Sequence, residues 1–64
     1  MVRINGNERN AAGMTVAEYL ETADFDQKRI SVERNGEIVF KSQFADTVLC
    51  DGDVIEIVSF VGGG

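Results

Sequence analysis

The segment most suited to chemistry is the glycine-rich end, Phe60-Val61-Gly62-Gly63-Gly64. We expect Gly64 to carry a free α-carboxylate, because no residue follows it in the sequence. Glycine has no Cβ, so a run of glycines can lie extended in a slot too narrow for other residues. At ~3.3 to 3.6 Å per residue, the glycines place this carboxylate roughly 10 Å beyond the last side chain. That reach suits delivery of a carboxylate into the active site of another protein.

The alternative interpretation of the glycines is a frayed terminus or an expression remnant. Delivery is favoured because the glycines follow directly on the apolar segment 54–61, without a Ser or Pro spacer. Ordering a residue costs about 1 to 2 kcal/mol, and more for glycine than for other residues. We therefore expect 62–64 to be a flexible tail until a partner holds it.

The remaining composition offers little catalytic chemistry. The 64 residues include no His and one Cys, and six Lys and Arg against eleven Asp and Glu give a formal charge of -5. This excludes a His general base, a Cys/His pair and a zinc or iron–sulfur ligand set. A chain this short buries only about 60% of its unfolded surface, which leaves no room for a deep substrate cleft. We therefore expect no enzyme.

Charge and hydropathy also restrict the partners. An acidic chain lacks the clustered Lys and Arg that a nucleic-acid binder needs, so no nucleic-acid partner is expected. No apolar run is long enough to span a bilayer or to resemble a signal peptide. The sequence therefore predicts a cytoplasmic protein with no membrane partner.

Three weaker candidates have simpler explanations. Asp51-Gly52-Asp53 resembles the start of a calcium loop but lacks the other ligands, so a turn is predicted. Cys50 has no His and no nearby Lys or Arg to activate it, so an ordinary thiol is predicted. Helix capping and a solvated face account for the carboxylates of Glu18, Glu21, Asp24 and Asp26.

One helix is predicted, over 16–23. Thr15-Val16-Ala17-Glu18 has the spacing of a capping box, in which Thr15 and Glu18 each accept from the other's backbone N–H. Met14 and Tyr19 can form the accompanying hydrophobic staple. Apolar residues recur at helical spacing at Val16, Tyr19, Leu20 and Ala23.

Three turn dipeptides divide the rest of the chain into strands: Asn5-Gly6, Asn35-Gly36 and Asp51-Gly52. The first joins strand 2–4 to a weakly patterned arm, 7–12, and the second joins strands 30–33 and 37–40. Segment 42–48 is predicted as an irregular or 3₁₀ crossover that buries Phe44 and Val48 or Leu49. Segment 54–61 is apolar on both faces and is predicted to be the central strand.

This order of elements predicts an α+β domain over 1–64 with a ubiquitin-like β-grasp fold. We expect a mixed sheet of about five strands, with the one main helix packed on one face. Strand side chains alternate between faces, so Ile55 and Ile57 should point into the core. Val58 and Phe60 should then point away from it.

These segments together resemble the ThiS family, the sulfur carrier proteins of thiamine biosynthesis. The resemblance spans almost the whole chain, through Val2-Arg3-Ile4-Asn5-Gly6, Thr15-Val16-Ala17-Glu18-Tyr19-Leu20, Val32-Glu33-Arg34-Asn35-Gly36-Glu37-Ile38-Val39, Thr47-Val48-Leu49, Asp51-Gly52-Asp53, Ile55-Glu56-Ile57-Val58 and Phe60-Val61-Gly62-Gly63-Gly64. Three positions depart from the family pattern: Phe40 replaces a common Pro, Phe44 a common Trp and Cys50 a common Lys. All three lie around the crossover, away from the tail.

The resemblance implies that an adenylating (E1-like) enzyme joins the Gly64 carboxylate to AMP from ATP. A sulfur nucleophile, supplied by a cysteine desulfurase or another sulfur donor, then displaces AMP. A thiazole synthase uses the resulting thiocarboxylate as its sulfur source. The chain itself would be a protein co-substrate that binds no cofactor, because its partners supply the ATP and the sulfur. Tail recognition would rest on Gly62 and Gly63, and a partner interface beside the tail would include Val58, Phe60 and Val61.

Three alternatives remain open at the level of sequence. One is a sulfur carrier for molybdopterin or another sulfur pathway, which shares the fold and the glycine end. Another is a ubiquitin-like modifier that forms isopeptide bonds with lysines. The third is an interaction domain whose tail has no function.

Overall fold

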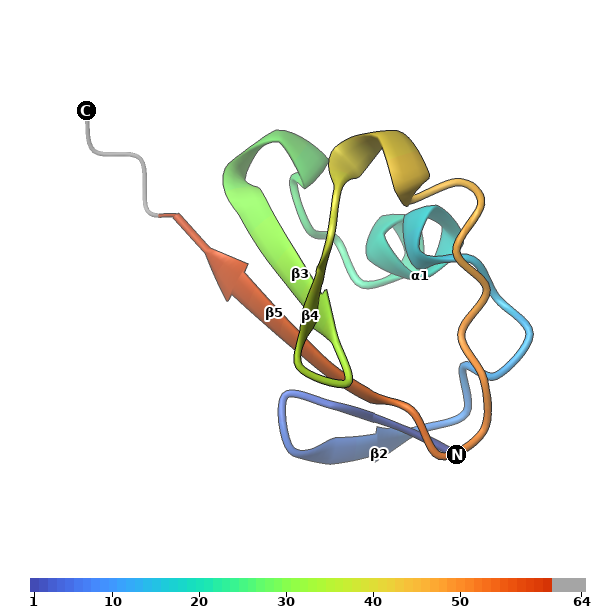
Figure 1. Ribbon diagram of the computed structural model, residues 1–64. Coiled ribbons are helices and arrows are strands. Elements are labelled where there is room, and N and C mark those ends of the chain that lie inside the picture. Colours follow the sequence, from blue (N-terminus) through green and yellow to red (C-terminus); the bar gives the residue numbers. More distant parts are fainter. Residues whose placement is uncertain (61–64) are drawn as a thin grey trace.

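Eight short elements follow one another along residues 1–60, the part of the chain that this computed structural model describes (Figure 1). They are β1 (Val2–Ile4), β2 (Asn7–Arg9), α1 (Val16–Thr22), the 3₁₀ turn η1 (Gln27–Arg29), β3 (Ile30–Arg34), β4 (Glu37–Val39), the 3₁₀ turn η2 (Lys41–Gln43) and β5 (Val54–Ser59). The predictions made for Val61, Gly62, Gly63 and Gly64 lie outside the described residues.

The strands form one mixed sheet in the order β2-β1-β5-β3-β4. β5 is central, parallel to β1 and antiparallel to β3, and a hairpin completes the sheet on either side. Helix α1 covers one face of this sheet (Figure 1). The architecture is the predicted one, with the last strand at the centre.

Two hairpin turns have the predicted geometry. Asn5 and Gly6 have φ values of 50° and 83°, and Asn35 and Gly36 have 52° and 86°. A type I′ turn needs positive φ at both central positions, and Asn-Gly supplies it at low steric cost. These turns set the register of β1 with β2 and of β3 with β4.

The predicted capping box begins helix α1. The Glu18 N–H donates to Thr15 Oγ1 at 3.1 Å, and the Thr15 N–H donates to Glu18 Oε1 at 2.9 Å. Two further N–H groups of the first turn, those of Val16 and Ala17, donate to backbone carbonyls of the crossover at 2.9 and 3.0 Å. The crossover thus satisfies helix donors that would otherwise lack partners.

In the described part of the chain, helix and sheet enclose a core of twelve buried apolar residues: Val2, Ile4, Ala11, Val16, Leu20, Ile30, Val32, Val39, Phe44, Leu49, Ile55 and Ile57. Met14 and Tyr19, the predicted staple, are half-buried against it. In the crossover Phe44 and Leu49 are buried, as predicted, whereas Val48 is 46% exposed.

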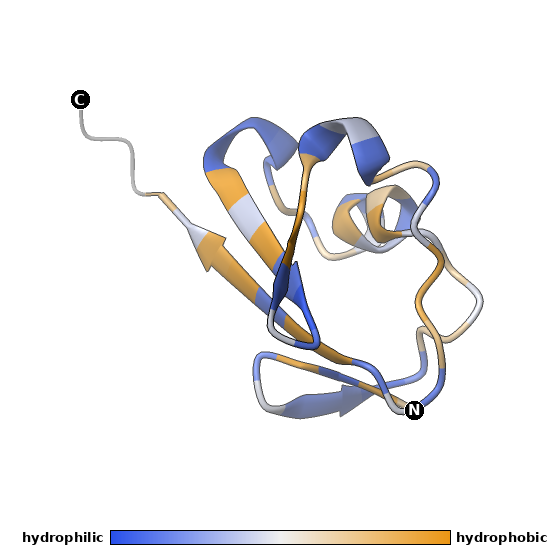
Figure 2. Cartoon of the chain, viewed as in Figure 1, coloured by the Kyte–Doolittle hydropathy of each residue, from blue (hydrophilic) through white to orange (hydrophobic). Residues whose placement is uncertain are grey.

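Three elements end before the segments predicted for them do. Within the weakly patterned arm 7–12, β2 is a short strand that ends at Arg9, because its partner β1 has only three residues. β5 ends at Ser59, opposite Ile30, the first residue of β3. The helix ends at Thr22, shortly before Asp24 takes a left-handed φ of 62°. Figure 2 shows the resulting contrast between the largely hydrophobic β5 and the hydrophilic edge strand β2.

Candidate functional site

The carboxyl end of β5, at Ser59, is separated from the glycine segment by two residues. β5 pairs with β3 in unbroken register from Ile55 opposite Arg34 to Ser59 opposite Ile30. One further bond follows the strand, from the Phe60 N–H to the Arg29 carbonyl at 2.7 Å. The sheet therefore holds the chain in place as far as Phe60.

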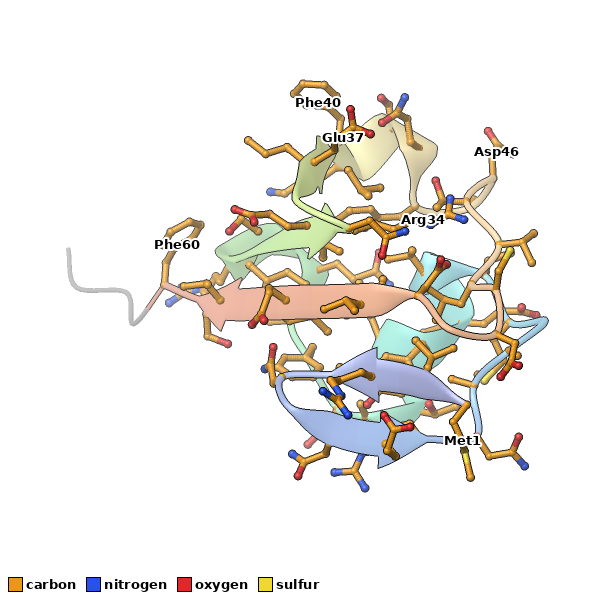
Figure 3. All side chains as sticks on the ribbon, turned by 60° about the horizontal axis from the view of Figure 1, so that its bottom comes forward. Met1, Arg34, Glu37, Phe40, Asp46 and Phe60 are labelled. Carbon is orange, nitrogen blue, oxygen red and sulfur yellow. The ribbon has the colours of Figure 1, made fainter. Side chains whose placement is uncertain are left out.

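The two faces of β5 differ as predicted. Ile55 and Ile57 are 2% and 7% exposed, whereas Val58 and Phe60 are 55% and 58% exposed on the opposite face. Figure 3 shows the Phe60 ring projecting to one side of the tip of β5. Neighbouring strands therefore do not cover the two described residues of the predicted interface.

The same outer face of the sheet carries more apolar surface and a pair of like charges. Val54 and Ile38 are 43% and 61% exposed. Glu33 and Glu56 lie directly opposite each other on β3 and β5, both exposed. Like charges in this position destabilise a sheet. The sequence could not reveal this pair, because it depends on the register between distant strands.

Two asparagines fasten β5 to its neighbours. The Asn5 side chain donates to the Ile57 carbonyl at 3.0 Å and accepts from the Ile57 N–H at 2.7 Å. The Asn35 side chain accepts from the Val54 N–H at 2.9 Å. Sequence reasoning assigned both residues to turns alone. Nothing in the sequence indicates that their amides also bond to β5.

A buried carboxylate fixes the start of β5. Asp53 is 7% exposed, and it accepts from Arg34 Nε at 2.8 Å, Asn35 Nδ2 at 3.1 Å and the Cys50 N–H at 2.9 Å. Burial alone raises the pKa of Asp53. The three hydrogen bonds and the Arg34 charge outweigh burial and bring its pKa below the ordinary value of 3.8. Asp53 is therefore a structural anion, a role that the predicted turn did not include.

The expectation that no Lys or Arg lies near Cys50 is wrong. Arg34 Nη2 lies 3.6 Å from the Cys50 thiol. The two residues are 16 positions apart, but antiparallel pairing brings the end of β3 beside the start of β5. Only the register of the sheet reveals this contact.

Other carboxylates have structural roles. Glu18 completes the helix cap, and Asp26 accepts from the Lys28 N–H at 3.0 Å at the start of η1. No group of three or more His, Cys, Asp or Glu side chains in residues 1–60 is arranged to hold a metal ion. Asp51 and Gly52 form a turn, as predicted. Within the same residues, no helix has the length and hydrophobicity needed to cross a membrane.

Comparison with protein families matches residues 2–64 to the ThiS family. The chain belongs to the ThiS family. It is 42% identical over 67 residues to the sulfur carrier protein ThiS of Bacillus subtilis and 38% identical over 64 residues to that of Thermus thermophilus. Both alignments cover all of both chains. The prediction of a sulfur carrier of thiamine biosynthesis, a protein co-substrate and not an enzyme, is confirmed.

A solved structure and a longer relative extend this assignment. A crystal structure of ThiS from Geobacter metallireducens matches with a TM-score of 0.77 at 33% identity, covering 98% of this chain and 97% of that one. The predicted ubiquitin-like ThiS fold is thereby confirmed. A thiazole synthase of Paramagnetospirillum magneticum is 52% identical over 62 residues, covering 95% of this chain. This chain spans only 19% of that thiazole synthase, about a fifth.

Proposed function

We propose that this ThiS-family chain carries sulfur on the Gly64 carboxylate. A partner adenylating enzyme would join the carboxylate oxygen to the α-phosphorus of ATP, releasing pyrophosphate. Hydrosulfide would then attack the carbonyl carbon and release AMP, which leaves a thiocarboxylate. A persulfide donor would instead form an acyl disulfide, and a thiol reductant would cleave its S–S bond to release the thiocarboxylate and a disulfide of the donor. The first step is needed because a carboxylate is a poor electrophile until it gains a good leaving group. Because ATP is consumed, we propose that the reaction takes place in the cytoplasm.

The single observation that carries this proposal is the placement of β5. The sheet holds the backbone as far as Phe60, four residues before Gly64, and the family match extends to residue 64. A rigid domain with its reactive group on a short glycine segment can present that group inside a partner. Gly62 and Gly63 are proposed to pass through a narrow channel in the partner, because each lacks a Cβ.

Val58, Phe60 and Val61 are proposed to contact the adenylating enzyme. Support comes from the exposure of Val58 and Phe60, 55% and 58%, within four positions of the first glycine of the tail. Exposed apolar residues beside a reactive segment are typical of a protein docking site. A Phe60→Glu variant should fold normally, since this ring is exposed, but should be adenylated much more slowly. Ala45→Glu, at another exposed position, is the control.

Thiazole synthase is the proposed acceptor of the sulfur. Support comes from the thiazole synthase of P. magneticum, which contains a segment 52% identical to this chain. That relationship favours the thiamine pathway over the molybdopterin pathway. A cysteine desulfurase or another donor would supply the sulfur.

The decisive measurement is intact mass spectrometry of the chain recovered from cells that express its partners. We expect one oxygen to be replaced by one sulfur, located at Gly64 by fragmentation. Gly63→Val and a chain lacking Gly64 should show no such exchange. If either variant gained sulfur like the wild type, the proposed role of the glycines would be refuted. High-mass lysine conjugates in place of sulfur would indicate a protein modifier.

A further inference from the structure

Within residues 1–60, the edge of β5 that faces β1 is open at Ser59. β1 pairs with β5 only at Arg3–Val54 and Ile4–Ile55, and the Asn5 side chain then occupies both backbone groups of Ile57. The next residue whose backbone faces the same way is Ser59. Figure 3 shows the tip of β5 extending past the β1–β2 turn, with β3 along its other side.

The hydrogen-bond pattern fixes this direction. In an antiparallel ladder, successive residues turn their N–H and C=O groups alternately toward and away from the paired strand. Phe60 donates to Arg29 and Val54 accepts from Asn35, so the even-numbered residues of β5 bond toward β3. Ser59 therefore turns away from β3, and neither its N–H nor its C=O has a hydrogen-bond partner among residues 1–60.

We infer that an extended segment of the adenylating enzyme pairs with this edge and adds a strand to the sheet at Ser59. A backbone donor and a backbone acceptor presented together from one strand residue match the backbone of another extended segment. The outward side chains on either side of Ser59 are Val58 and Phe60, so strand pairing and apolar contact would meet the same partner. This inference rests on the proposed function.

Pairing at this position would also fix the distance between the partner's paired strand and Gly64. Gly64 is five positions beyond Ser59, which corresponds to roughly 17 Å of fully extended chain at ~3.3 to 3.6 Å per residue. A strand bonded to Ser59 fixes the starting point of that distance. The Asn5 amide sets where the open edge begins, because it closes the ladder at Ile57. Asn5 is thus a positioning residue for the edge.

Ser59→Pro tests the inference, because proline removes the N–H at the open edge and leaves the bonds to β3 in place. Proline is tolerated at such edge positions. Ser59→Ala is the matched control, since it loses the hydroxyl and keeps the N–H. We expect Ser59→Pro to form the thiocarboxylate about 2- to 10-fold more slowly than Ser59→Ala, the value of one net hydrogen bond. Their urea unfolding midpoints should remain close to each other.

A second variant covers the case in which proline disturbs the fold. Cys50 is the one cysteine of the chain, so residues 1–49 can be ligated to a synthetic 50–64 segment that carries N-methylserine at position 59. The ligated chain with ordinary serine is its control, and N-methylation should slow sulfur transfer by a similar factor.

The outcomes separate the two proposals. Equal thiocarboxylate formation by Ser59→Pro and Ser59→Ala, or by the two ligated chains, would overturn the open-edge inference and leave the sulfur carrier role intact. No sulfur on the wild type would overturn the proposed function, and this inference with it. A wild-type dimer that Ser59→Pro abolishes would assign the edge to a second copy of the chain, which also overturns the inference.

Discussion

Replacing Asp53 with alanine should lower the free energy of unfolding by about 3 kcal/mol. The Cys50 N–H and the Asn35 amide would each lose a hydrogen bond, at about 1 kcal/mol apiece. Arg34 would lose its charged partner, but its side chain is 33% exposed, so water recovers part of that loss and about 1 kcal/mol remains. A 64-residue domain has only roughly 3 to 10 kcal/mol in total, so this loss would remove about a third or more of its stability.

Urea denaturation followed by circular dichroism measures this loss. Asp51→Ala is the matched control, because it removes the same charge from the same turn. The Asp51 side chain is 79% exposed and pairs with the N-terminal amine at the surface, so its loss should cost less than about 1 kcal/mol. Equal stability of the two variants would show that the buried network does not hold the start of β5.

The same carboxylate gives a pH signature. Its pKa is lower in the folded chain than the ordinary 3.8, so its stabilisation is present above that value. It is lost as the pH falls through the lower, folded pKa. The stability difference between wild type and Asp53→Asn should therefore be constant near neutral pH and shrink below pH 3.8. A difference that grew on acidification would contradict the direction of the pKa shift.

Three further predictions concern stability. Asn5→Gly keeps a residue that accepts the φ of 50° but removes two hydrogen bonds to Ile57, so it should lower the free energy of urea unfolding by about 1 to 2 kcal/mol. Asn7→Ala is the control, because the Asn7 side chain makes one long 3.5 Å bond, and it should cost less than about 0.5 kcal/mol. Thr15→Ala removes the side-chain half of the capping box and should cost about 1 kcal/mol, whereas Thr22→Ala, at the other end of α1, should cost less. Glu33→Gln removes the repulsion with Glu56 and should raise the free energy of unfolding by about 0.2 to 1 kcal/mol at low salt. Because salt screens charges, an equal gain in 1 M salt would rule out a charge effect.

The features that the sequence predicted correctly are mostly local. Asn-Gly specifies a tight turn and Thr-x-x-Glu specifies a helix start, because the interacting groups lie within a few residues of one another. The apolar pattern of 54–61 also identified the central strand and which of its residues face outward. Resemblance to one family then directed attention to Gly64.

The features that the sequence did not predict depend on register. The contacts of Asp53 with Arg34 and of Asn5 with Ile57 span 19 and 52 positions. Each requires two particular residues to become neighbours across strands, and composition and periodicity carry no such information. The position of the open edge at Ser59 also follows from register, because it depends on where β1 ends.

The strand order has a consequence for biosynthesis. β1 and β3 are not paired with each other, because β5 lies between them in the sheet. Translation proceeds from the N-terminus, so both hairpins are made before the strand that joins them. Isolated hairpins are marginal in water, and long-range pairing is slow to form. The domain should therefore fold only once residues 54–59 have left the ribosome, and until then the two hairpins are separate and marginally stable.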